Sequence, residues 1–206
     1  MDIQKVIKIC KKCRQYIVIP GEKKVQWLGN DTAQYCISNH PKFTPEYLTA
    51  MAELEPQEVE ISFFKTISLP EGLDNSDYTD DENTVQISSV TVVIDDEKYI
   101  PLYTSKGLRF LNAKYLEPFK KDEFDIYERF SQDGRLYFAV KVGMFCNAII
   151  GDEKTGIRFD LVHEFDKLAK QLKNAYDVMQ TEAEIRKEQK RPEDVSNDKK
   201  TVDENN

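Results

Sequence analysis

The chain has 206 residues, with 37 acidic against 29 basic side chains and a formal charge of −8. Hydrophobic residues make up 40% of it and the mean hydropathy is −0.60. This composition can bury a core, and it excludes a collagen-like, wholly disordered or integral membrane protein. Lysines interrupt every apolar run near the N-terminus, so we expect no secretory signal, no membrane contact and a cytoplasmic location.

The charge is unevenly distributed. Residues 1–24 carry seven basic and two acidic groups, whereas residues 68–97 carry nine acids and no lysine or arginine. Such an acidic window repels phosphate and is well solvated, and a basic groove of a partner protein would attract it. The candidate partner-binding residues in this window are Asp74, Asp77, Asp80, Asp81 and Glu82.

The first third of the chain predicts a series of short helices and strands. Residues 2–13 place apolar side chains at helical spacing between lysines, which predicts an amphipathic helix. Thr44 is a typical N-cap and Pro45 a typical first helical residue, so a short helix is expected after residue 44. Strands are expected at residues 15–19, 24–28, 33–37 and 58–67.

The middle of the chain predicts a loop followed by strands. Residues 69–84 are acidic, polar and interrupted by proline and glycine, as in a surface loop or a locally disordered insert. Residues 143–150 are apolar throughout, so their period does not distinguish a strand from a buried helix. Strands are expected at residues 85–94, 98–103, 108–111, 125–130 and 135–142.

A long C-terminal helix is expected from residue 158. Apolar residues recur at steps of three or four from Leu161 to Met179, which predicts an amphipathic helix packed on the domain. Beyond it, Pro192 prevents continuation of the helix. The predicted fold is therefore α+β, with a mainly antiparallel meander sheet. Residues 1–180 form one domain, and residues 181–206 form a charged helix end and a disordered tail.

A candidate metal site is formed by Cys10, Cys13, Cys36 and His40, which read as Cys-x2-Cys followed by Cys-x3-His. Zinc takes four nitrogen or sulfur ligands, and the hairpin between the two pairs could bring them together. The alternative is that these cysteines are ordinary reduced thiols, with no cofactor bound. If these four residues bind zinc, they and the basic N-terminal segment would together form a zinc-stabilised nucleic-acid-binding module.

No motif in the sequence specifies a reaction. Glycine-rich phosphate loops are absent, and the two histidines have no nucleophile at a recognisable spacing. An enzyme would need an acidic site that is assembled only in three dimensions, and this remains an alternative.

Several blocks of the sequence resemble a group of proteins of unknown function from phages, prophages and other mobile elements of Gram-positive bacteria. The blocks are VQWLGNDTAQY at residues 25–35, YIPLYTSKGLRFL at 99–111, YLEP at 115–118, IYER at 126–129 and YFAVKVG at 137–143. The resemblance implies a mobile-element origin and transfers no active site. Together with the missing catalytic motifs, it favours a non-enzymatic accessory protein that binds another protein.

Overall fold

The computed structural model of the chain describes residues 1–22, 24–94, 96–152 and 159–189. Contacts divide the chain into two compact units, Met1–Ile157 and Arg158–Asn206. The α+β class is confirmed, with a large mixed sheet, a smaller sheet and a few helices. The expected disordered tail lies outside the described residues.

The helices of the described residues are α1 (Ile3–Cys13), α2 (Pro45–Met51), α3 (Pro56–Glu60), the 3-10 helix η1 (Ala113–Phe119) and α4 (Phe159–Gln189). The large sheet contains, in spatial order, β4 (Phe63–Thr66), β1 (Gln15–Pro20), β2 (Val25–Gly29), β3 (Ala33–Ser38), β12 (Phe145–Gly151), β11 (Leu136–Val142), β10 (Asp125–Phe130) and β5 (Asn83–Thr84). The small sheet contains β6 (Gln86–Ile87), β7 (Val92–Ile94), β8 (Glu97–Thr104) and β9 (Gly107–Asn112).

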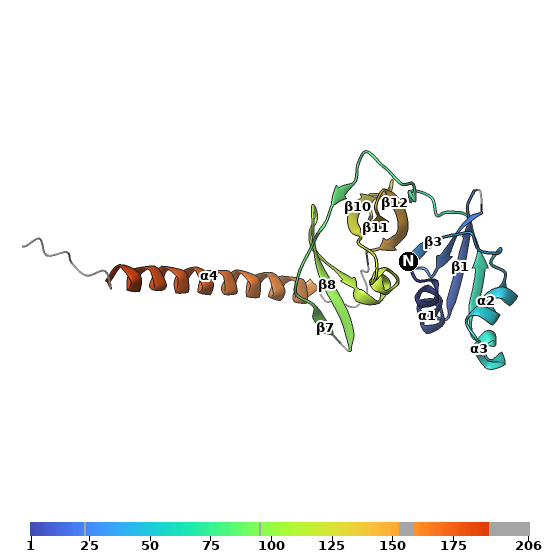
Figure 1. Cartoon of the computed structure of the whole chain (residues 1–206), viewed down its shortest axis with the longest axis horizontal. Helices are drawn as coiled ribbons and strands as arrows, with labels where there is room; N and C mark the ends of the chain where they lie inside the picture. Colours follow the sequence, from blue (N-terminus) through green and yellow to red (C-terminus); the bar gives the residue numbers. More distant parts are fainter. Residues whose placement is uncertain (23, 95, 153–158, 190–206) are drawn as a thin grey trace, which may run out of the picture. The chain divides into compact units, whose positions relative to one another are not determined.

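The large sheet is not one continuous meander. The antiparallel runs β1–β2–β3 and β10–β11–β12 join through the antiparallel pair β3–β12, and β4 pairs with β1 in parallel. In Figure 1 β1 is seen along its length while β10, β11 and β12 are seen nearly end-on, so the sheet twists strongly between its two halves.

Both faces of the inner strands of the large sheet are buried, whereas the edge strands β4 and β5 are largely exposed. On one face, which we call the α1 face, Tyr16 and Leu28 pack with Val6 and Cys10 of α1 in the larger apolar core. On the other face, Trp27 and further apolar side chains form a second cluster. Because strand side chains alternate between the faces, a strand buried on both sides has no polar alternation, as in the run QYIVIP of β1.

Local signals account for the first helices. The Asp2 carboxylate accepts a hydrogen bond from the amide of Gln4 (3.0 Å), which caps α1. The Thr44 hydroxyl caps α2 in the same way, accepting from the amide of Tyr47 at 3.2 Å. These caps satisfy amides that have no partner within the helix, so both helices begin where the sequence predicts.

Two predicted strands are corrected by the structure. Residues 58–60 belong to α3, because Glu55 and Glu58 form a capping box around Pro56 at the helix start. Residues 85–94 do not form one strand. Val85 bonds to β10, whereas β6 and β7 pair with β8 of the small sheet. Between them, the Ser88 hydroxyl accepts from the amide of Val90 at 3.1 Å, a local turn that interrupts pairing.

The apolar run after residue 142 is a strand. Gly143 adopts a φ of 62°, a left-handed conformation that suits glycine and permits the tight turn from β11 into β12. The pairing of β11 with β12 then skips Asn147, which makes a β-bulge. The bulge directs Cys146 to the second cluster, while Ala148 and Ile150 face the α1 face.

The second unit is described by α4 alone, with side chains described at residues 163 and 166–182. From the sequence, its apolar residues are expected to pack on the domain. Of that row, Leu168 is 50% exposed and Leu172 is 63% exposed. Among the described helices, none combines the length and the apolarity that crossing a membrane requires.

A substitution at Gly29 tests how closely the backbone of the β2–β3 hairpin is packed. A Cβ at this position would lie 1.8 Å from the carbonyl oxygen of Ala33, whereas at Gly151 it would meet its nearest atom at 3.5 Å. We therefore expect Gly29→Ala to lower the free energy of unfolding by about 1–3 kcal/mol or more. Gly151→Ala, the matched control in the same sheet, should change it by less than 1 kcal/mol, on the order of a tolerated surface substitution. Urea unfolding followed by Trp27 fluorescence measures both, and equal effects would contradict the close approach.

Candidate functional site

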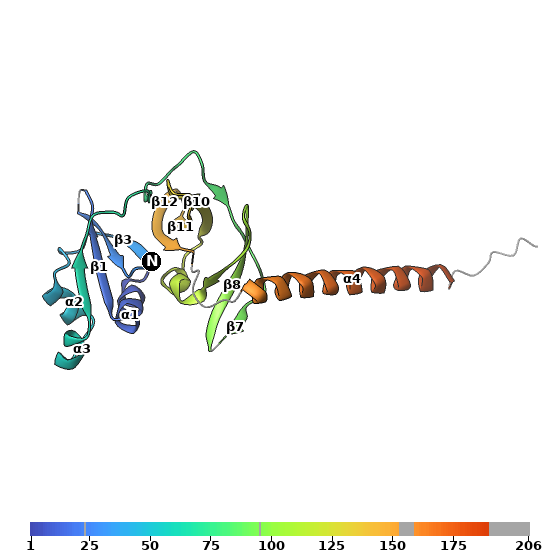
Figure 2. The ribbon, with the colours of Figure 1, turned by 180° about the vertical axis from the view of Figure 1, so that it is seen from behind.

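The acidic loop is fixed across the second face of the large sheet. We call residues 67–82 the strap, and the face that it covers the strap face. Ile67, Leu69 and Leu73 pack against the second apolar cluster. Figures 1 and 2 show this segment, teal to green, crossing from the β4 end of the sheet to the strands β10–β12. The expected solvated insert is therefore a loop with a defined packing face.

Arg129 on β10 is the main anchor of the strap. Its side chain is 1% exposed, and its hydrogen bonds go to strap residues. The guanidinium Nε and Nη2 donate to Glu82 Oε2 at 2.9 and 2.6 Å. Nη1 donates to the carbonyl oxygens of Asp74 and Ser76, each at 3.0 Å. A planar guanidinium with donors on several edges suits such a set of acceptors.

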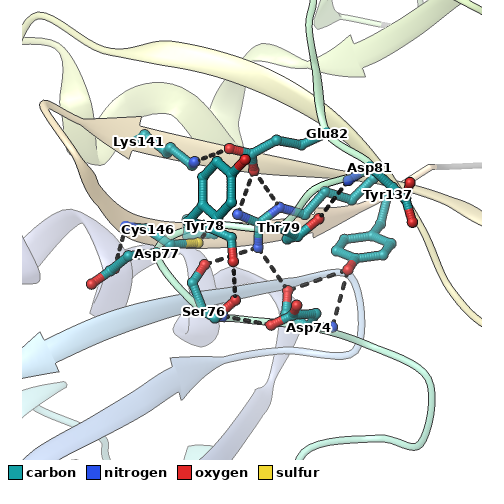
Figure 3. Close-up of polar contacts among 12 residues, drawn as sticks. Asp74, Ser76, Asp77, Tyr78, Thr79, Asp81, Glu82, Tyr137, Lys141 and Cys146 are labelled. Carbon is teal, nitrogen blue, oxygen red and sulfur yellow. Dashed lines mark hydrogen bonds and ion pairs between the residues drawn. The ribbon is translucent and has the colours of Figure 1, made fainter.

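Lys141 completes the buried ion cluster. Its Nζ donates to Glu82 Oε1, the oxygen that Arg129 does not use, and lies 4.5 Å from the centre of the Tyr127 ring. The side chains of Lys141 and Glu82 are 6% and 8% exposed. Figure 3 shows Glu82 reaching into this contact from the strap. Because both cations share one carboxylate, removing either leaves charge buried with fewer partners.

Two further contacts hold the strap backbone. The Tyr137 hydroxyl accepts from the amide of Asp74 at 3.0 Å and donates to its carbonyl oxygen at 3.2 Å. Asp77 Oδ1 accepts from the amide of Cys146 at 2.9 Å, which the β-bulge at Asn147 places on the strap face. Figure 3 shows the contacts of Asp74 with Tyr137 and of Asp77 with Cys146 near the Glu82–Lys141 pair, so the strap is fixed at several points along its length.

An open groove lies beside the fixed strap. It has a volume of about 1060 Å³, and Trp27 and Cys36 are among its lining residues, with the β1–β2 turn, the strap and the β11–β12 turn around them. Phe145, 66% exposed, is the first residue of β12 and directly follows the last of these turns. Glu22 and Asp77 are exposed acids of the lining, and no described lining residue is Lys, Arg or His. The groove is thus apolar with an acidic rim.

The structure separates the five predicted partner-binding acids into two groups. Glu82 is engaged by Arg129 and Lys141 through both oxygens, so it is not available to a partner. The other four are exposed on the strap, and only Asp77 also lines the groove. These four are Asp74, Asp77, Asp80 and Asp81.

The four predicted zinc ligands do not converge. Cys10 and Cys13 belong to the core of the α1 face, whereas Cys36 packs with the strap-face cluster. His40 stacks on Phe43, with ring centres 6.2 Å apart. Among the described residues no three His, Cys, Asp or Glu side chains are placed to hold a metal ion. The zinc module therefore gains no support from this arrangement.

Three lysines of the basic N-terminal segment, Lys5, Lys11 and Lys12, are paired within the fold. Lys12 Nζ lies 2.7 Å from Glu97 Oε1, and Lys11 Nζ lies 3.1 Å from Glu58 Oε2. Lys5 donates to the carbonyl oxygen of Glu117 at 3.0 Å. Charges that are paired this way are less available to phosphates, so the lysines serve first to hold α1 in place.

No acid pair suited to catalysis is assembled by the buried carboxylates Glu82 and Glu128. Glu128 accepts from Asn83 Nδ2 at 3.3 Å and from the amide of Ser105 at 2.8 Å. Glu128 and Arg129 are neighbours on β10, so Glu128 and the Glu82 bound to Arg129 lie on opposite faces of the strand. Burial raises the pKa of the Cys146 thiol to about 12, which makes it a poor nucleophile at neutral pH.

Sequence reasoning missed the residues that build the site. Arg129 and Lys141 stand in the strand sequences DIYERF and LYFAVKV, where a charge among apolar neighbours is a signal for a buried partner. The partner could not be identified, because Glu82 is one of nine acids in its window. Comparisons with protein-family models, curated proteins and solved structures find no match.

Replacing Arg129 tests the anchor. Arg129→Met leaves the Ser76 carbonyl without a donor, the Asp74 carbonyl with Tyr137 alone and Glu82 with one cation, so we expect a loss of about 3–5 kcal/mol in the free energy of unfolding. Lys141→Met keeps the Arg129–Glu82 contact, and its loss should be smaller, about 1–3 kcal/mol. Urea unfolding followed by Trp27 fluorescence measures both. A smaller loss for Arg129→Met than for Lys141→Met would refute the role of Arg129 as the main anchor.

The Lys12–Glu97 pair gives a pH test. The hydrogen bond from Lys12, followed by that from Asn112, lowers the pKa of Glu97 from its ordinary 4.5. A lowered folded pKa contributes stability that is present above 4.5 and is lost as the pH falls through the folded value. Lys12→Met should therefore cost less than about 1 kcal/mol at pH 7. The difference from the unmodified chain should shrink below pH 4.5. A difference that stays constant to lower pH would show that the pair does not act through its charges.

Proposed function

We propose that this chain is a non-enzymatic accessory protein, of phage or mobile-element origin, that binds another protein in the cytoplasm. The resemblance of residues 25–35, 99–118 and 126–143 supports the origin. The observation that carries the binding proposal is the groove beside the strap. The strap forms one wall and is held by Arg129, and the described lining residues include no base. An exposed aromatic ring next to such a groove is typical of a protein-binding surface.

The chemistry of the groove indicates its partner. An apolar side chain of the partner would enter against Trp27 and Phe145, because exclusion of water from apolar surface drives such contacts. A lysine or arginine next to it would meet Asp77, whose second carboxylate oxygen is not used by Cys146. The other exposed acids of the strap would attract a basic partner over a longer range. The fitting partner is a protein segment with neighbouring apolar and basic residues.

The test uses the full chain, immobilised and exposed to a lysate of Gram-positive bacteria, with each captured protein then titrated against the variants. Phe145→Ser removes the exposed ring without disturbing the core, and we expect it to weaken binding about tenfold or more. Asp77→Asn keeps an oxygen acceptor for the Cys146 amide but removes the charge, so we expect a loss of about two- to fivefold that disappears in high salt.

The matched control is Glu71→Gln, which removes one charge from the strap outside the groove. It should bind the captured protein within about twofold of the unmodified chain. The proposal fails if no protein is captured, or if Phe145→Ser captures the same proteins with the same affinity as the unmodified chain.

A further inference from the structure

A small cavity lies between the strap and the large sheet. It has a volume of about 110 Å³, and its apolar lining includes Ile67 and Leu73 of the strap and isoleucines of β1 and β12. In the pairing register Gly29 lies between Ile17 and Gln34, which both line the cavity. Because glycine has no side chain, none separates these two residues, and space remains under the strap.

Gln34 brings an unused hydrogen-bond acceptor to this cavity. The residue is 8% exposed, and its Nε2 donates to the carbonyl oxygen of Asn30 at 2.6 Å. Since a carbonyl oxygen only accepts, the amide must present its nitrogen there, which fixes the orientation of the side chain. The other end of the amide, Oε1, is buried and receives no hydrogen bond from the described residues. A buried acceptor without a donor is unfavourable, so this site favours a molecule that supplies one.

The other buried polar groups of the lining are already engaged. Asn30 Oδ1 accepts from the amides of Thr32 and Ala33 at 3.0 and 2.8 Å. The Tyr137 hydroxyl is used in both directions by the backbone of Asp74. A buried water makes about two to four hydrogen bonds, so a water on Gln34 Oε1 would have few further partners. A molecule with one donor and an apolar body has no such need.

Charge and size narrow the class of ligand. No described residue of the cavity lining is Lys, Arg or His, so an anion would meet no opposite charge. A cation would lose its hydration among aliphatic side chains, which is unfavourable as well. An apolar cavity of about 150 Å³ binds benzene, so this smaller cavity suits a molecule of about four or five non-hydrogen atoms.

We propose that the cavity binds a small, uncharged, largely apolar molecule whose N–H or O–H group donates a hydrogen bond to Gln34 Oε1. The ligand lies under the strap, between Leu73 and the isoleucines of the sheet. Of the residues that line the cavity, only Ile19 also lines the groove beside the strap. The site is therefore separate from the groove, and its test does not depend on the proposed protein binding.

The test uses pyrrole and furan as probes. Both are uncharged five-membered aromatic rings of nearly equal size, and pyrrole carries an N–H donor whereas furan carries none. NMR titration of the isotope-labelled full chain follows the side-chain amide of Gln34 and the methyl groups of Ile17 and Leu73. We expect a dissociation constant on the order of 1 mM for pyrrole. Furan should bind about fivefold more weakly, because it leaves Oε1 without a donor.

Three variants locate the site. Leu73→Phe places a larger side chain in the cavity, so it should weaken both probes about tenfold or more. Leu69→Phe makes the same change on the strap outside the cavity lining, and pyrrole binding should stay within about twofold. Gln34→Met removes the acceptor from a side chain of similar length, so the preference for pyrrole should fall below about twofold.

A dispersed amide spectrum shows that each variant is folded, and the comparison of pyrrole with furan needs only the unmodified chain. Three results would overturn the proposal. The first is no saturable shift with either probe, as for a cavity that holds only water. The second is equal affinity for pyrrole and furan, and the third is pyrrole binding that Leu73→Phe leaves unchanged.

Discussion

The contact between Arg129 and the strap is the constraint on which the first unit depends. It takes a charged side chain out of water in the middle of an apolar face, and the fold compensates by bringing a carboxylate and two carbonyl oxygens to it. The strap cannot move away without leaving that guanidinium unpaired. The acidic composition of the strap predicts a solvated loop. Because of this requirement, the strap instead covers one face of the large sheet and forms one wall of the groove.

The charged side chains behind the net charge of −8 therefore have three separate roles. Lysines of α1 pair with acids from other parts of the chain, as Lys12 does with Glu97, and fix the helix. One acid of the strap, Glu82, is buried against Arg129 and Lys141. The remaining strap acids are exposed around a groove whose described lining includes no base. This last group lies where a partner in the groove would meet it.

Local features of the fold could be predicted from the sequence because they depend on neighbouring residues. The cap at Thr44 and the helical spacing of residues 2–13 are examples, and the structure has helices at both places. The packing of the strap on the sheet could not be predicted. Glu82 and Arg129 are 47 positions apart, and the sequence does not show which of the many acids pairs with Arg129. The helix α3 was not predicted, because the apolar and polar alternation over residues 58–67 indicates a strand that starts at residue 58, whereas the structure has a capped helix there.

The central claim is that Arg129 holds the strap in one place against the sheet. Amide hydrogen exchange, followed by NMR, tests it most directly. In the unmodified chain the amides of Asp74 and Cys146, which donate to Tyr137 and Asp77, should exchange slowly. In Arg129→Met they should exchange much faster while the amides of β2 and β3 remain protected. Exchange of both amides at the rate of an unstructured peptide in the unmodified chain would contradict the account.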